Sequence, residues 1–138
     1  MYVSITGLRL NSFLHIPKFW YYAIPSMVQA QGAEGNLSAE SRSVGGVHHT
    51  LSVWKDRKSM LRYLRSGDHA KAMSIFDDIA TGKTYGYEIE SEEDIPTWEE
   101  AIELYNTKGR VVGKAGREMR AAERRSEACP HVAVSPSE

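Results

Sequence analysis

Apolar and polar residues alternate near the start of the chain, and this pattern predicts a β-strand over residues 2–10, with Val3, Ile5 and Leu8 among its apolar positions. Residues 13–31 are rich in aromatic side chains and form a run too long for a strand. They predict a helix, and Pro25 should kink or restart it because proline supplies no backbone N–H.

A pair of strands follows. Residues 37–44 are small and polar, residues 47–54 carry strong alternation, and Gly45 and Gly46 lie between them. Two glycines between two strand patterns are typical of a tight hairpin turn. We therefore expect an antiparallel hairpin.

Two helices are predicted next. Asp56 is a helix cap, and the apolar residues after it are spaced three and four apart up to Leu64. The second helix covers residues 68–80, and its apolar stripe contains Phe76.

The remaining pattern predicts one more strand and one more helix. Thr81-Gly82 should close the preceding helix, so that residues 83–89 form the strand. A capping-box pattern at Thr97 starts a short helix, and Gly109 ends the folded part.

This order of elements predicts an α+β fold of the ferredoxin-like, split βαβ type. In that fold a four-stranded antiparallel sheet has helices on one face, here over a domain of residues 1–109. The other face needs covering, and a second copy packed sheet to sheet would cover it. We therefore expect a homodimer.

Composition fits one ordinary globular domain, with 138 residues, 41% hydrophobic and 25% charged. The formal charge of −1 gives no field that would attract nucleic acid. Cys129 is the single cysteine, which favours a reducing compartment. With no signal-peptide pattern and no uninterrupted apolar span, we expect a cytoplasmic protein without a membrane span.

Residues 110–138 differ from the rest of the chain. They have few large apolar residues, and six basic side chains stand against four acidic ones. Residues 114–128 have good helix propensity, which predicts a frayed or partner-docked helix, with disorder from Pro130 onward. In the alternative reading, this basic segment docks on a protein partner.

The residues between Gly46 and Ala80 are similar to a known superfamily. The similar run is His49-Thr-Leu-Ser-Val-Trp54-Lys-Asp, then Met60, then Tyr63-Leu-Arg-Ser66-Gly-Asp-His69-Ala-Lys-Ala-Met73. It resembles the dimeric α/β-barrel superfamily, within it the antibiotic-biosynthesis-monooxygenase-like and spheroidene-monooxygenase-like proteins. The resemblance implies the ferredoxin-like fold and a dimer. It leaves the reaction open, because the superfamily includes cofactor-free oxygenases acting on polycyclic phenols and haem-degrading enzymes.

The resemblance also raises the question of haem. In haem-degrading relatives an aromatic residue and an iron-ligating histidine occupy the places of Tyr63 and Met73. Methionine is a weaker ligand here, and His69 lies one turn earlier. We predict no cofactor, with haem as the option left open.

His69 is the catalytic candidate. It lies near a helix N-terminus, where the helix dipole disfavours the charged imidazole, so the neutral ring can act as a base. The alternative is a structural histidine that is hydrogen-bonded and docks the two helices on the sheet.

His48 and His49 are neighbours on one strand, so their side chains point to opposite faces and cannot hold one metal ion. We predict no metal site. His49 shares its face with Leu51 and Val53, which makes it a core or cavity residue.

The leading hypothesis is a monooxygenase-like enzyme that binds a small apolar or aromatic substrate between helices and sheet, with His69 as its catalytic group. The expected substrate-binding residues are Trp20, His49, Trp54, Tyr63, Met73 and Phe76. The plain alternative for each is a core side chain. The competing functions are a non-enzymatic binding or assembly protein that uses its basic tail and, third, a haem-binding protein.

Overall fold

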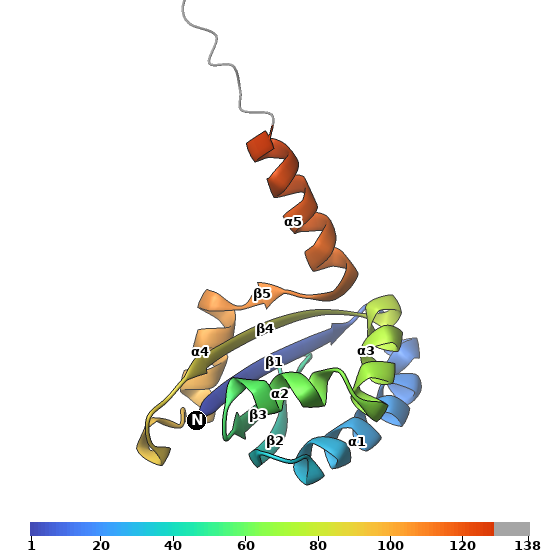
Figure 1. Cartoon of the computed structure of the whole chain (residues 1–138). Helices are drawn as coiled ribbons and strands as arrows, with labels where there is room; N and C mark the ends of the chain where they lie inside the picture. The colour runs from blue at the N-terminus through green and yellow to red at the C-terminus, as the bar shows by residue number, and fades with distance from the viewer. Residues whose placement is uncertain (129–138) are drawn as a thin grey trace, which may run out of the picture.

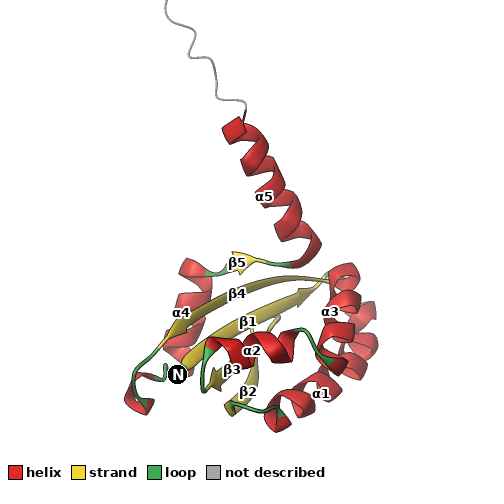
Figure 2. Ribbon diagram, in the orientation of Figure 1, coloured by secondary structure: helices red, strands yellow, loops and turns green. Residues whose placement is uncertain are grey.

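The computed structural model describes residues 1–128, apart from the side chains of Asp68 and Ala128. Figures 1 and 2 show one sheet with helices on both sides and a last helix that leaves the body. The strands are β1 (Tyr2–Leu10), β2 (Asn36–Val44), β3 (Val47–Trp54), β4 (Ala80–Glu88) and β5 (Arg110–Val111). The helices are η1 (Phe13–His15), α1 (Ile16–Gly32), α2 (Arg57–Leu64), α3 (Gly67–Ile79), η2 (Glu92–Asp94), α4 (Trp98–Lys108) and α5 (Gly113–Ala128).

The sheet confirms the split βαβ topology and corrects the number of strands. The strand order is β2-β3-β1-β4-β5, and every neighbouring pair is antiparallel. The predicted four-stranded sheet has a fifth strand, because Arg110 and Val111 pair with Thr84 and Lys83. Gly109 therefore does not end the folded part.

The predicted hairpin is confirmed. Val44 pairs with Val47, and the two glycines between them have φ angles of 58° and 78°. Two successive residues with positive φ define the hairpin turn that matches the twist of antiparallel strands. Glycine adopts this conformation without steric cost, which is why the pattern was informative.

The predicted helix caps are also present. An Asp56 carboxylate oxygen accepts a hydrogen bond from the Ser59 N–H at 2.7 Å, and the Thr97 hydroxyl accepts one from the Glu100 N–H at 3.2 Å. Helix α1 does not restart at Pro25, one of the two outcomes expected there, but continues through it as a single helix. Pro25 is exposed there, so water can bond the carbonyl that lacks a donor.

The boundary between α3 and β4 lies earlier than predicted. Strand β4 begins at Ala80, directly after the helix, and Thr81-Gly82 lies within it rather than closing the helix. A side chain at Gly82 would come within 2.7 Å of the Leu8 side chain on β1. The glycine makes room for that leucine, which is a use that glycine has in strands as well as at helix ends.

Helices cover both faces of the sheet. Helices α1, α2 and α3 lie on one face, and α4 lies on the other (Figure 1). On the α4 face, a core cluster joins side chains of β1 and β3 to Ala101 and Tyr105 of the helix. The Tyr105 ring lies on Gly7, and its hydroxyl donates to the Gly7 carbonyl oxygen at 3.4 Å. The face that we expected a second copy to cover is therefore packed by the chain's own α4.

Within residues 1–128, no helix combines the length and the apolar character needed to cross a bilayer. The predicted helix over residues 114–128 is present as α5. Cys129 and the disorder predicted from Pro130 onward lie outside the described residues.

Candidate functional site

A cavity of about 540 Å³ lies between the sheet and helices α1, α2 and α3. This volume falls in the range that holds small organic ligands. Its walls are mainly apolar side chains of the three helices, and its floor is the face of the sheet that carries the even-numbered residues of β1 and β3. The helix residues that line it include Phe19, Trp20, Ala23, Ile24, Met27, Val28, Met60, Tyr63, Leu64, His69, Met73 and Phe76.

The floor of the cavity carries hydroxyl groups. We call Ser4, Thr6, Ser41, Thr50, Ser52 and Thr84 the hydroxyl floor. Ser52 accepts a hydrogen bond from the buried Trp54 indole N–H at 2.9 Å, and Thr84 donates to the Ile5 carbonyl oxygen at 3.2 Å. An apolar roof over a polar floor suits a flat ligand with an apolar body and one or more oxygens.

Three rings form a row at the cavity. Tyr63 stacks on Trp54 with ring centroids 5.2 Å apart, and the His69 ring contacts Tyr63 at a tilt with centroids 4.4 Å apart. The Tyr63 hydroxyl donates to the Ser26 carbonyl oxygen at 3.0 Å, which anchors the row to α1. Burial raises the pKa of the Tyr63 phenol, so it stays protonated and serves as a fixed donor.

The protonation of His69 follows from its contacts. Its Nδ1 lies 3.3 Å from the Leu64 carbonyl oxygen. Because a carbonyl only accepts, that contact is a hydrogen bond when Nδ1 carries the proton. Burial lowers the pKa of His69 below 6.5, partly opposed by this bond. At neutral pH the ring is therefore uncharged, and Nε2 carries a free lone pair on a residue that lines the cavity.

Gln29 of α1 holds the start of α3 in place. Its side-chain oxygen accepts the His69 backbone N–H at 2.8 Å, and its nitrogen donates to the carbonyl and the hydroxyl of Ser66, both at 3.0 Å. Ser66 makes no capping bond with its own side chain. Gln29 thus supplies the cap from another helix, and it fixes the backbone that carries His69.

We expect Gln29→Ala to lower the free energy of unfolding by about 1 kcal/mol, the usual cost of losing a helix cap. Amide hydrogen exchange at His69 should accelerate more than exchange at sites in the sheet, because its acceptor is lost. Gln31→Ala is the matched control, since Gln31 bonds the Ala39 carbonyl oxygen and does not contact α3. Equal acceleration in both variants would contradict the capping role.

His48 is a second imidazole at the cavity. Its ring meets Phe19 and Trp20 edge to face, with centroids 5.2 Å and 5.0 Å away. Burial, and next the charge of neighbouring His49, lower the pKa of His48. It is therefore uncharged at neutral pH and can accept or donate one hydrogen bond to a ligand.

Six of the seven residues singled out from the sequence lie at this one cavity. They are Trp20, Trp54, Tyr63, His69, Met73 and Phe76. His49 does not line it, which corrects the expectation for that residue. His49 points to the α4 face, is 2% exposed, and meets the Tyr105 ring edge to face with centroids 4.7 Å apart.

Sequence reasoning assigned no site role to the hydroxyl floor, to His48 or to Gln29. Serine and threonine at alternate positions of β1 and β3, such as Ser4, Thr6, Thr50 and Ser52, were a usable signal for a polar sheet face. Gln29 had none, because its partners are 37 and 40 residues away in sequence. Among the described residues, no cluster of three or more His, Cys, Asp or Glu side chains could hold a metal ion.

The sequence matches no protein-family model and no curated protein. Solved structures do match. A candidate antibiotic biosynthesis monooxygenase from Deinococcus radiodurans gives a TM-score of 0.60 at 16% identity, over 70% of this chain and 100% of that one. A second candidate of the same kind, from Nitrosomonas europaea, gives 0.59 at 14% identity, over 66% and 100%. SnoaB, a cofactor-independent oxygenase from Streptomyces nogalater, gives 0.56 at 8% identity, over 67% and 96%.

These matches define the class of fold. The chain has the ferredoxin-like α+β fold of the antibiotic-biosynthesis-monooxygenase type, as the resemblance between Gly46 and Ala80 predicted. At such low identity a shared fold does not carry a shared reaction. The relatives are covered almost completely, whereas about a third of this chain has no counterpart in them.

Proposed function

We propose that the chain is a cofactor-independent, monooxygenase-like enzyme whose substrate is a flat, apolar phenol. The observation that carries the proposal is the uncharged imidazole of His69 at a cavity of about 540 Å³ with aromatic walls. The fold similarity to SnoaB, a cofactor-independent oxygenase, supports the same class of reaction.

The proposed chemistry begins with a proton transfer. The ligand ring lies against Tyr63 and His69, with its oxygens toward the hydroxyl floor. Nε2 of His69 removes the acidic proton, leaving an electron-rich anion on the ligand and a protonated imidazole. Molecular oxygen is the co-reactant that oxidises this anion. The mainly apolar walls hold the apolar body of the ligand and keep the anion beside its base.

Binding and turnover test the proposal separately. We expect 1-naphthol to quench tryptophan fluorescence, because Trp20 and Trp54 both line the cavity. We expect oxygen consumption with anthrone, which reacts with one O₂ to give anthraquinone and one water. The rate must exceed the rate of anthrone in buffer alone. Saturable binding with no enzymatic oxygen consumption for any of a panel of anthrones and naphthols would reject the oxygenase and leave a binding protein.

Haem is the alternative ligand, because Met73 and His69 line one cavity and lie one turn apart on α3. Haem carries two propionates, whereas Lys83, the one lysine or arginine among the residues that line the cavity, holds its ammonium 5.9 Å from the Tyr105 ring centroid on the α4 face. The residues therefore fit haem poorly, and we propose no step through it. We expect no Soret band above that of free haemin when haemin is titrated into the protein.

The second candidate function is a non-enzymatic assembly protein. It is favoured by α5, which projects from the body (Figure 1). Deletion of residues 113–138 separates the two functions, since it should spare 1-naphthol binding and remove any partner. The deletion must begin after Val112, because Val112 lines the cavity. The homodimer and the cytoplasmic location stay predictions; a sheet-to-sheet dimer would have to form around α4.

A further inference from the structure

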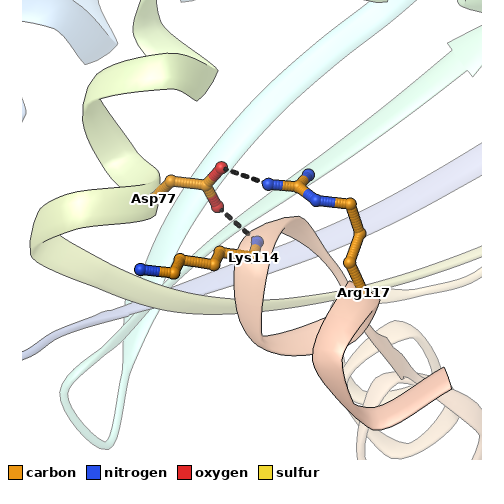
Figure 3. A network of polar contacts seen from close by, with 3 residues as sticks. All are labelled: Asp77, Lys114 and Arg117. Carbon is orange, nitrogen blue, oxygen red and sulfur yellow. Dashed lines mark hydrogen bonds and ion pairs between the residues drawn. The ribbon is translucent and has the colours of Figure 1, made fainter. Parts of the chain in front are cut away.

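Helix α5 is attached to the body through a well-defined joint. An Asp77 carboxylate oxygen of α3 accepts the backbone N–H of Lys114 at 2.9 Å, and its other oxygen lies 3.5 Å from the Arg117 guanidinium (Figure 3). Gly113 has a φ of 71°, which favours glycine. Arg120 donates to the Val111 carbonyl oxygen at 3.2 Å. These contacts fix the direction in which α5 leaves the body.

Beyond this joint the helix stands alone. Figure 1 shows α5 projecting from the sheet and the other helices, and residues 122–127 are all exposed. An isolated helix of 16 residues with glycine in its first turns is marginal in water, since most helices in proteins depend on packing. A helix held in a defined direction but without packing partners along most of its length is typical of an element that docks on another surface.

The exposed side of α5 carries a regular seam. Ala115, Met119, Ala122 and Ser126 are spaced four, three and four residues apart, and all four are exposed. This is the spacing by which one helix packs against another in a coiled coil. Met119 is 52% exposed, and Gly116, on the side toward the body, is buried. The seam therefore faces away from the rest of the chain.

The charged residues beside the seam favour a second copy of α5 as the partner and an antiparallel pairing of the two helices. In a parallel pair, Glu118 would face Glu123 of the partner subunit, and like charges would repel. In an antiparallel pair centred between Met119 and Ala122, Glu118 faces Arg125 of the partner subunit. A twofold axis makes this contact twice, because each copy presents the same surface.

We propose that α5 is an interaction surface for a second copy of this chain, joined as an antiparallel helix pair along Ala115, Met119, Ala122 and Ser126. Two reciprocal ion pairs between Glu118 and Arg125 set its register. The two bodies lie at opposite ends of the pair, so they do not compete for space over a helix length of about 24 Å. This link is separate from the cavity and does not rest on the proposed reaction.

A charge-swap experiment tests the proposal on the full chain. Glu118→Arg puts arginine against arginine, and Arg125→Glu puts glutamate against glutamate. Sedimentation equilibrium measures the self-association of each variant alone. We expect the dissociation constant of the α5 contact between two copies to rise at least about tenfold, which corresponds to about 1.4 kcal/mol. An equimolar mixture of the two variants restores the association, because the charges then face each other in opposite sign.

The control is Arg124→Glu, which makes the same charge change on the side away from the seam and should associate like the wild type. The proposal is overturned if both single variants associate like the wild type, or if their mixture stays as dissociated as either alone. Binding of 1-naphthol is measured on the same samples. If the dissociated variants still bind 1-naphthol, the substitutions have altered only the α5 surface. The test of α5 is then independent of the test of the proposed function.

Discussion

Replacing His69 by Ala is expected to lower enzymatic oxidation of anthrone by roughly 10²- to 10⁴-fold, the usual contribution of a general base. The Leu64 carbonyl and the Tyr63 ring each lose one contact at the cavity wall, so the fold should persist. Affinity for 1-naphthol should fall by much less than the rate, since the variant removes one ring contact from binding but the whole proton transfer from the reaction. Oxygen consumption and fluorescence titration measure the two effects.

The controls for this variant use the other histidines. His15→Ala alters a histidine that does not line the cavity and should leave both readouts unchanged. His48→Ala, at the cavity, should weaken binding more than it slows the reaction. Wild-type rates for His69→Ala with intact binding would remove the imidazole from the mechanism.

The pH profile supplies an independent check on His69. Burial lowers the pKa of its imidazole below the ordinary 6.5, so the base form predominates at neutral pH. The turnover rate should fall only as the pH drops through this lowered pKa, on the acid side of the range in which a free imidazole titrates. A rate that already declines between pH 8 and 7 would show that another group titrates.

Tyr105→Ala is expected to reduce the free energy of unfolding by about 3 kcal/mol, the largest stability effect we anticipate. Tyr105 is a residue of α4, is 7% exposed, and packs against Gly7 and the core cluster of the sheet. Its removal leaves a void against Gly7, which has no side chain to fill it, and the buried His49 loses its ring contact. Urea denaturation measures the change.

The matched control is Tyr21→Ala, the same substitution at a tyrosine that is 73% exposed. It should cost no more than about 0.5 kcal/mol. A similar loss in both variants would mean that α4 does not carry the packing that we ascribe to it. The cavity lies on the opposite face, so 1-naphthol binding by folded Tyr105→Ala protein should be retained.

Local signals were enough to predict most of the fold. Alternation placed β1 and β3, the Gly45-Gly46 pair fixed the hairpin, and Asp56 and Thr97 began helices as expected. Each of these depends on residues close together in sequence, where backbone chemistry decides the structure. Strand β5 could not be predicted in this way. Two residues, Arg110 and Val111, carry no periodicity, and their strand exists only because β4 offers an open edge.

The structure gathers the candidate residues of the helices at one cavity and places one strand residue, His49, in the core instead. The four-residue spacing on α3 put His69 and Met73 on one face, the family resemblance singled out Tyr63, and all three line one cavity. For His48 and His49, alternation separated the two side chains correctly but could not show which face borders a void. That depends on α4 filling one face with Tyr105 while α1 to α3 leave space over the other.

The most direct measurement is the position of a bound ligand, obtained from intermolecular nuclear Overhauser effects between 1-naphthol and the isotope-labelled protein. We expect contacts from the naphthol ring to Trp20, Tyr63 and the His69 imidazole, which all line the cavity. Contacts confined to Tyr85 and Tyr87, which pack against the core cluster on the α4 face, would rule out this binding site.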